Sequence, residues 1–239
     1  MKLFFFTYVD RNPKYRAEAD ILIRSGRRFG RDIYLFEIPD GAMWNRYKVD
    51  LLAAELPAAD RYICLDSDTI LTGPGDWEAE DCQGVMDILY YCDEHERDKH
   101  TKAFIRNHTI CRGDPGAYDC VLSLWRQFND PIWPNSGVVV LDAGIRLPFA
   151  ECWKQWMAQI DSHCDRGYII GDEAPCMFAR HEFGLPLLPP RFNICLKWQP
   201  VPADAVLLHA DGNVTGEKRI PYNEVLEDLI AYERTAKAL

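Results

Sequence analysis

Two aspartates one residue apart, Asp66 and Asp68, have the spacing that most directly suggests chemistry in this chain. They follow a mostly apolar segment, residues 61–65, which reads as a buried strand. Side chains at positions i and i+2 of an extended chain point the same way, so both carboxylates face one place. Such a pair favours a cation between the two charges, and Mg²⁺ and Mn²⁺ prefer oxygen ligands. The spacing therefore predicts a divalent metal site that handles a phosphorylated substrate, although aspartate is also common in turns that end a strand.

The segments before these aspartates alternate between strand and helix patterns. Apolar runs predict strands at residues 3–9 and 32–37, and apolar positions at helical spacing predict helices at residues 13–26 and 44–55. Alternation of this kind implies a mostly parallel sheet with right-handed crossovers, whose ligands bind beyond the carboxyl ends of the strands. We therefore expect the end of the first strand to lie beside Asp66 and Asp68.

The later part of the chain supplies further elements. The pattern predicts a strand at residues 135–142, a helix that begins at Pro148, a short strand at residues 204–209 and a terminal helix at residues 221–238. Trp153 and Trp156 share an apolar face of the helix after Pro148, so we interpret both as core residues.

Charge and cysteine content narrow the class of protein. The formal net charge of −10 and the pI of about 5.1 argue against broad binding to nucleic acids or anionic membranes. No apolar run approaches the roughly 20 residues that span a bilayer. The nine cysteines are odd in number and form no Cys-x-x-Cys pair, which favours reduced thiols over a disulfide framework or a zinc site. We therefore expect a cytoplasmic protein with no transmembrane segment and no nucleic-acid partner.

Two further polar residues lie in apolar surroundings, and each has two interpretations. His209 ends an apolar strand, where a histidine is usually structural, but an ion held by two carboxylates takes further ligands and imidazole suits Mn²⁺. Lys48 lies on an apolar helix face and extends its ammonium either to solvent or to a phosphate beyond the sheet edge.

The strand that ends in Asp66-Ser67-Asp68 resembles the Asp-x-Asp strand of GT-A-fold glycosyltransferases, especially the family-8 group that includes glycogenin and galactosyltransferases. Other segments resemble motifs of that group in the same order along the chain. These are Thr7-Tyr8-Val-Asp10, Lys48, Asn135-Ser136-Gly137, Gly171-Asp172-Glu173, Leu188 to Asn193, and Leu208-His209-Ala-Asp-Gly212. The resemblance covers nearly the whole chain. It implies one α/β domain of the Rossmann-like GT-A type over residues 1–239, with a mostly parallel central sheet flanked by helices.

The resemblance also implies a role for each matched residue. Residues 1–75 would form the nucleotide-binding half, and residues 130–239 the metal, donor-sugar and acceptor half. The implied metal ligands are Asp66, Asp68 and His209. Contacts to the nucleotide-sugar are implied for Thr7, Tyr8, Asp10, Lys48, Asp66, Ser67, Asn135, Ser136, Gly137, Gly212 and Lys218. Catalytic contacts at the donor sugar are implied for Asp172 and Glu173, which also precede a helix that they could cap. Asn193 matches a residue near the acceptor side, where Trp198 is a candidate stacking residue.

Two departures from the family pattern stand out. The family places a diphosphate-binding lysine soon after His-x-x-Gly, whereas the first lysine here, Lys218, comes farther along the chain. The family often has glutamine where this chain has Glu173, and a carboxylate changes what the site can do.

The function implied is transfer of a sugar from a UDP-sugar to an unidentified sugar, lipid or protein hydroxyl, assisted by Mn²⁺ or Mg²⁺ and with retention at the anomeric carbon. If the reaction inverted that centre, Glu173 or Asp172 would be the natural base.

Three alternatives are weighed against this interpretation. A haloacid-dehalogenase-type phosphatase also uses Asp-x-Asp and Mg²⁺, but it carries the motif on its first strand, with Thr or Val where this chain has Ile70. A sugar-phosphate nucleotidyltransferase would have a glycine-rich first loop, and residues 7–13 contain no glycine. A catalytically silent nucleotide-sugar-binding protein remains an alternative because of the altered segment after His209.

Overall fold

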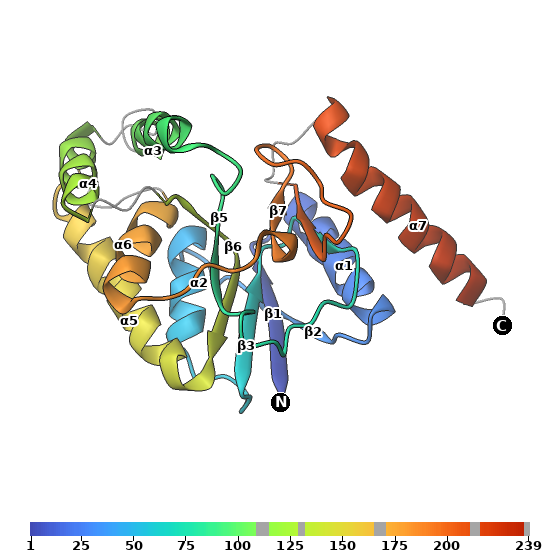
Figure 1. The fold of residues 1–239 in the computed structure, drawn as a ribbon. Helices are drawn as coiled ribbons and strands as arrows, with labels where there is room; N and C mark the ends of the chain where they lie inside the picture. Colours follow the sequence, from blue (N-terminus) through green and yellow to red (C-terminus); the bar gives the residue numbers. More distant parts are fainter. Residues whose placement is uncertain (109–114, 129–131, 165–170, 211–215, 237–239) are drawn as a thin grey trace.

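A computed structural model describes residues 1–108, 115–128, 132–164, 171–210 and 216–236 (Figure 1). Within them the chain forms a five-stranded sheet, a three-stranded sheet and helices around both. The first part contains β1 (Leu3–Val9), α1 (Pro13–Arg28), β2 (Ile33–Glu37), α2 (Trp44–Ala53), β3 (Arg61–Leu65), β4 (Thr69–Leu71), β5 (Gly84–Asp87), α3 (Glu94–His108) and α4 (Pro115–Phe128). The second part contains β6 (Pro134–Asp142), α5 (Ala143–Asp161), α6 (Glu173–Phe183), the 3₁₀ turn η2 (Pro190–Phe192), β7 (Ile194–Cys195), β8 (Leu207–His209), η3 (Gly216–Arg219) and α7 (Ile220–Ala236).

The larger sheet has the strand order β2-β1-β3-β6-β5. β1 is parallel to both β2 and β3, while β6 is antiparallel to β3 and to β5. Four of its five strands therefore run the same way, which confirms the predicted mostly parallel α/β sheet. Thr7 pairs with Leu65, so the ends of β1 and β3 are neighbours, as the sequence predicted.

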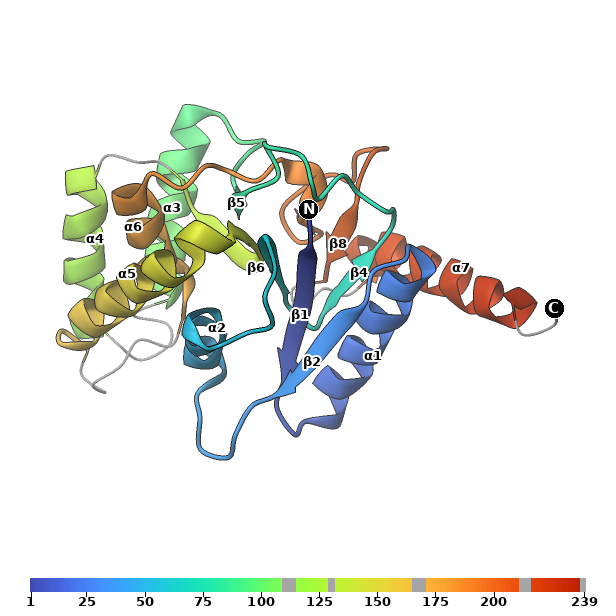
Figure 2. The ribbon, with the colours of Figure 1, turned by 90° about the horizontal axis from the view of Figure 1, so that it is seen from below.

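Helices cover both faces of this sheet, as the view in Figure 2 shows with α1 on one side and α2 and α5 on the other. Successive side chains of β1 alternate between the faces. Phe4 and Phe6 belong to the core beneath α2, α5 and α6, and Phe5 packs in the core that includes Leu22 of α1. Burial on both faces explains why β1 reads as a nearly continuous apolar run, interrupted only by the buried Thr7.

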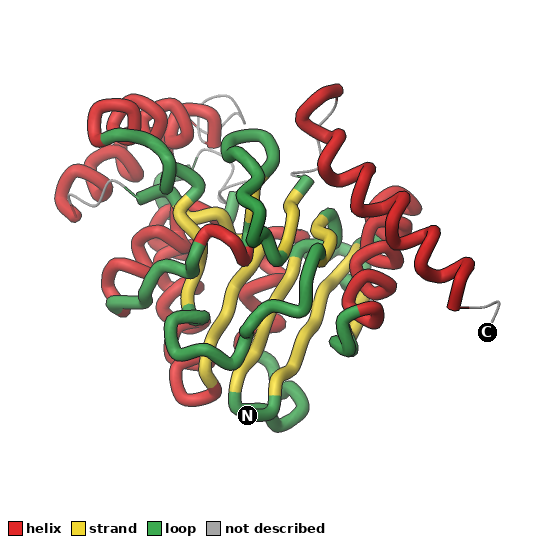
Figure 3. The backbone as a smooth tube through the Cα atoms, turned by 45° about the vertical axis from the view of Figure 1, so that its right-hand side comes forward, coloured by secondary structure: helices red, strands yellow, loops and turns green. Residues whose placement is uncertain are grey.

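The smaller sheet has the order β4-β8-β7 and lies beside the larger one (Figure 3). β4 follows Asp68 directly and pairs antiparallel with β8, with Thr69 opposite His209. The backbone N–H of Ala210 donates to the carbonyl oxygen of Asp68 at 3.0 Å. This pairing holds His209 beside the two aspartates despite their distance in sequence.

Several predicted boundaries change. The helix predicted from Pro148 begins at Ala143, because β6 leads directly into α5 and Pro148 lies inside the helix. A proline there costs a backbone hydrogen bond, and the full burial of Phe149 and Trp153 offsets that loss. The last strand is shorter than predicted, and the terminal helix is described up to Ala236.

Two expectations about the class of protein can be compared with the described residues. Eight cysteines lie among them, and all eight are free thiols. None of the helices in the described ranges has the length and apolar character needed to cross a membrane.

Candidate functional site

Asp66, Asp68 and His209 come together at the carboxyl end of β3. Each offers a ligand atom, and these atoms lie within 4.8 Å of one another. Nε2 of His209 is 3.2 Å from Oδ1 of Asp68. The side chains of Asp66, Asp68 and His209 are 25%, 13% and 5% exposed, so the cluster opens to solvent on the Asp66 side. Two carboxylates and one imidazole fit Mn²⁺, and the carboxylates alone fit Mg²⁺.

The turn that carries the aspartates is fixed by its own backbone and by β6. The N–H of Asp66 donates to the carbonyl oxygen of Gly137 at 2.8 Å, and Oγ1 of Thr69 donates to the carbonyl oxygen of Asp66 at 2.7 Å. Ser67 lies between the aspartates and is half-buried. The carboxylates are therefore held in place by secondary structure on both sides of the turn.

Lys48 crosses from α2 to this cluster and is only 1% exposed. Its Nζ lies 2.9 Å from Oδ1 of Asp66 and 3.1 Å from Oδ2 of Asp172. It also donates to the carbonyl oxygen and the hydroxyl of Ser136, at 2.8 and 2.9 Å. Burial opposes its charge, but Asp172 and Asp66 outweigh burial and hold the pKa of Lys48 well above its usual value. The interpretation that Lys48 extends to solvent was wrong, and its contact with a phosphate stays a prediction.

Asp172 is the residue before α6, yet its side chain makes no capping hydrogen bond to that helix. Its carboxylate instead accepts from Oγ of Ser136 at 2.8 Å and pairs with Lys48. Burial raises the pKa of Asp172, while the charge of Lys48 counteracts that rise. The prediction that the Asp172 side chain caps α6 is therefore wrong, because its carboxylate pairs with Lys48, which also contacts Asp66. Glu173 follows it as the first residue of α6, and its catalytic role stays a prediction.

The end of β1 contributes one direct contact to the cluster. The hydroxyl of Tyr8 donates to Oδ1 of Asp66 at 3.1 Å. Burial, and then the charge of Asp66, hold the pKa of Tyr8 well above its ordinary value, so the phenol keeps its proton. Thr7 is fully buried, and its hydroxyl has no hydrogen-bond partner among the described residues. Asp10 accepts from the N–H of Asn12 in the turn before α1, and its contact with the nucleotide stays a prediction.

The predicted Asn135-Ser136-Gly137 segment lies on β6 and contacts both parts of the site. Ser136 joins Lys48 to Asp172. Asn135 Oδ1 lies 3.1 Å from Nδ1 of His209, and Gly137 packs against the same imidazole. The structure thus places this segment beside His209, one of the predicted metal ligands, and beside the buried ammonium of Lys48.

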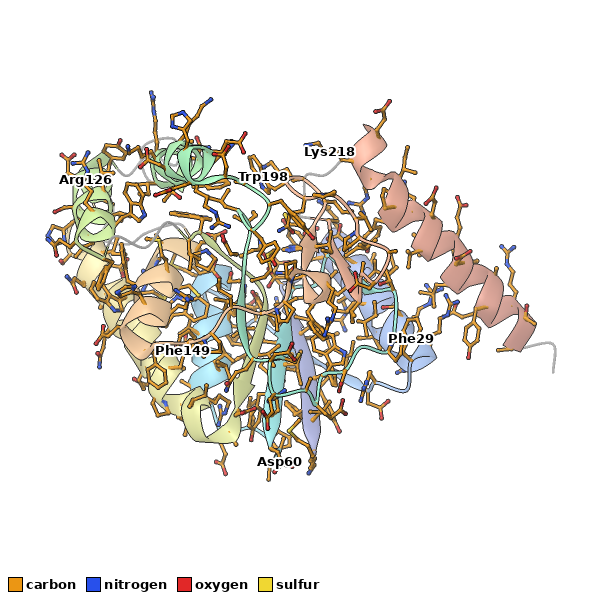
Figure 4. All side chains as sticks on the ribbon, in the orientation of Figure 1. Phe29, Asp60, Arg126, Phe149, Trp198 and Lys218 are labelled. Atoms are coloured by element: carbon orange, nitrogen blue, oxygen red, sulfur yellow. The ribbon has the colours of Figure 1, made fainter. Side chains whose placement is uncertain are left out.

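The segment after His209 places its basic residues differently. Gly212 lies outside the described residues. Lys218 is exposed and donates to the carbonyl oxygen of Lys197 at 2.6 Å. Figure 4 labels Lys218 and Trp198 in the upper part of the molecule, and Asp60, the residue before β3, at its lower end. Trp198 is 39% exposed, with Lys197 Nζ 5.1 Å from the centre of its ring. Their roles toward diphosphate and acceptor stay predictions.

Sequence reasoning missed Glu18, a carboxylate of α1 that is only 6% exposed. Its Oε1 lies 4.0 Å from the guanidinium of Arg219. Burial, followed by the charge of Asp68, raises the pKa of Glu18, so this carboxyl group belongs to the surroundings of the cluster. The sequence did carry a signal for its burial, because Glu18 lies at helical spacing from Leu22 and Ser25 on the buried face of α1.

Comparison with known proteins relates the fold of this chain to that of a solved structure. No family model matches the sequence, and no curated protein matches it. Among solved structures, the chain is similar to the crystal structure of a glycosyltransferase involved in the glycosylation of the major capsid of PBCV-1. The likeness covers 97% of this chain and 100% of that chain, at a TM-score of 0.50 and 11% sequence identity. It shows a glycosyltransferase-type α/β fold and does not single out the family-8 group.

Proposed function

We propose that this protein is a metal-dependent glycosyltransferase that moves a sugar from a UDP-sugar to an acceptor hydroxyl with retention at the anomeric carbon. The observation that carries the proposal is the gathering of Asp66, Asp68 and His209 beyond the carboxyl end of β3. In open α/β sheets this is where ligands bind. The fold shared with a glycosyltransferase supports the same assignment.

In this proposal Asp66, Asp68 and His209 hold Mn²⁺ or Mg²⁺. The bound ion supplies Lewis-acid stabilisation of the diphosphate that leaves the sugar. Lys48 adds a fixed positive charge at the same edge, because Asp66, Asp172 and Ser136 hold its ammonium in place. A preorganised charge of this kind stabilises developing negative charge without the cost of reorganisation.

The donor sugar would lie on the side of Asp172 and Glu173. A carboxylate there can bind sugar hydroxyls and stabilise the positive charge of an oxocarbenium-like transition state, as carboxylates do in glycoside hydrolysis. Thr7, Tyr8 and Asp10 would meet the nucleobase and ribose, so residues 1–75 form the nucleotide-binding half. Residues 130–239 would then supply the remaining donor contacts and the acceptor side.

The diphosphate would gain a further cation from the segment before α7. Lys218 donates to Lys197, whereas the neighbouring Arg219 approaches Glu18, whose pKa responds to both Asp68 and His209. Arg219 therefore joins Lys218 as a candidate for this contact. The engagement of Lys218 with a backbone carbonyl also favours a second candidate function, a silent nucleotide-sugar-binding protein.

Release of UDP from a panel of UDP-sugars separates the two functions. With Mn²⁺ present, we expect the wild type to release UDP, with water as acceptor if no other is supplied. Asp68→Asn should lower kcat/KM by about 10²–10³-fold, because it weakens the hold on the ion at the leaving group. The matched control is Asp98→Asn, which removes an exposed carboxylate paired with Lys102 and should leave turnover unchanged. Binding of UDP without any turnover would favour the silent protein, and equal rates for both variants would contradict the proposed metal site.

A further inference from the structure

Asn135 lies at the centre of a buried hydrogen-bond cluster behind the metal triad. Its Oδ1 lies 3.0 Å from the N–H nitrogen of Gly137, 2.8 Å from Nδ2 of Asn193 and 3.1 Å from Nδ1 of His209. Asn135, Asn193 and His209 are 8%, 0% and 4% exposed, so solvent cannot substitute freely for these bonds.

The backbone N–H of Gly137 decides where the protons of this cluster are. A backbone N–H can only donate, so the atom of Asn135 that faces it must be the amide oxygen. That oxygen can only accept, so Asn193 must present its NH₂ group to it. For the same reason Nδ1 of His209 must carry a proton, which leaves the lone pair of a neutral imidazole on Nε2.

Nε2 is the atom of His209 that faces Asp68, at 3.2 Å from Oδ1. A nitrogen lone pair and a carboxylate oxygen are both acceptors, so they repel at this distance unless positive charge lies between them. The third member of the triad, Asp66, adds another carboxylate to the same place. The proton arrangement around Asn135 thus directs the metal-binding atom of the imidazole at both aspartates.

Gly137 supplies the space that this arrangement needs. A Cβ atom at position 137 would lie 2.5 Å from Nδ1 of His209 and closer still to its Cε1. The imidazole therefore rests directly on the backbone of β6, where Asn135 can reach its Nδ1.

We infer that Asn135 and Asn193 are positioning residues of the metal site, which hold His209 in the Nδ1–H tautomer so that Nε2 binds the ion. The inference rests on the proposed function and moves both residues from their predicted places. Asn135 acts through the metal ligand in place of a donor-sugar contact, and Asn193 acts through Asn135 in place of an acceptor contact. A histidine ligand whose other nitrogen is held by a hydrogen bond is typical of metal sites, and loss of the partner typically costs about 10–100-fold in metal affinity.

The first readout is the histidine tautomer in metal-free protein at pH 8, from the ¹⁵N shifts of the imidazole rings. The chain has six histidines, and comparison with His209→Gln identifies the signals of His209. We expect Nδ1–H in the wild type and a mixture of tautomers in Asn135→Leu. Asn135→Asp keeps an acceptor at this position and should keep the Nδ1–H tautomer.

The second readout is Mn²⁺ affinity without nucleotide, followed by electron paramagnetic resonance. Asn135→Leu and Asn193→Asp, which replaces the donating amide by an acceptor of the same size, should each weaken binding by about 10–100-fold. Gln199→Leu is the matched control: it removes a buried amide that binds Cys195 and Asp87, and it should lower stability without changing Mn²⁺ affinity. Asn193→Asp also covers the case in which Asn135→Leu fails to fold.

The outcomes separate the inference from the proposed function. Wild-type Mn²⁺ affinity in Asn135→Leu and Asn193→Asp, together with the wild-type tautomer in Asn135→Leu, would overturn the inference and leave the proposed function standing. An effect on UDP-sugar binding alone, with Mn²⁺ affinity unchanged, would return Asn135 to the donor. Wild-type protein that binds Mn²⁺ no better than Asp68→Asn would overturn the proposed function, and the inference with it.

Discussion

Replacing Lys48 with methionine is expected to lower the free energy of unfolding by about 3–5 kcal/mol, measured by chemical denaturation in EDTA. Methionine keeps much of the stem of Lys48 but removes the ammonium. Asp172, which is 2% exposed, then loses the cation 3.1 Å from its carboxylate in a place where water cannot replace it. The large effect comes from this uncompensated buried charge.

The control is Lys154→Met, which breaks a pair with Asp50 at 3.1 Å whose side chains are 35% and 60% exposed. Exposed pairs contribute about 0–1 kcal/mol, so this variant should stay close to the wild type. The double variant Lys48→Met with Asp172→Asn should recover part of the loss, since the stranded carboxylate is gone. Equal stability of the Lys48 and Lys154 variants would show that the buried ion pair does not stabilise the fold.

Gly137→Ala is expected to weaken Mn²⁺ binding by at least about 10–100-fold, the loss typical when the orientation of a metal-binding histidine is disturbed. The new Cβ would overlap the imidazole of His209 and lie 2.8 Å from Oδ1 of Asn135, and the backbone there is fixed because the carbonyl oxygen of Gly137 accepts from the N–H of Asp66. The ring must therefore leave its position. The same overlap should cost about 1–3 kcal/mol of stability, as overpacking of a core does.

Gly144→Ala is the control for this substitution. Gly144 is in the first turn of α5, and a Cβ there meets no atom within 4 Å. This variant should gain up to about 1 kcal/mol of stability and keep its Mn²⁺ affinity. Tight Mn²⁺ binding by Gly137→Ala would show that His209 is not a ligand of the ion.

The positions of Asp66 and Asp68 at the end of β3 could be predicted from the sequence because their signals are local. The apolar runs of β1 and β3, the helical spacing between them and the Asp-x-Asp that follows β3 are all patterns of neighbouring residues. Because the carboxyl ends of neighbouring parallel strands meet at one edge of the sheet, the same patterns also predict that the end of β1, with Tyr8, lies near Asp66.

The rest of the site depends on contacts between distant segments. The position of Lys48 on an apolar helix face was correct, but helical spacing does not reveal how deeply its ammonium is buried or that Asp66 and Asp172 meet it there. Asn135 lies on β6 and Asn193 lies between η2 and β7, so their bond joins residues 58 positions apart in the sequence. Local sequence patterns do not reveal such a contact, and the resemblance implied a donor contact for Asn135 and a place near the acceptor side for Asn193.

The central claim is that UDP and a divalent ion bind together at Asp66, Asp68 and His209, and thermal unfolding tests it most directly. The experiment compares wild type and Asp68→Ala, each with UDP, with Mn²⁺, and with both. Ligand at a hundredfold excess over its Kd adds about 2.7 kcal/mol of stability, which at this chain length is roughly 5–10 °C in Tm. We predict that UDP raises the Tm of the wild type by that amount beyond any rise from Mn²⁺ alone, that it does so only when Mn²⁺ is present, and that this effect of UDP disappears in Asp68→Ala. A rise with UDP that needs no metal, or that persists in Asp68→Ala, would contradict the account.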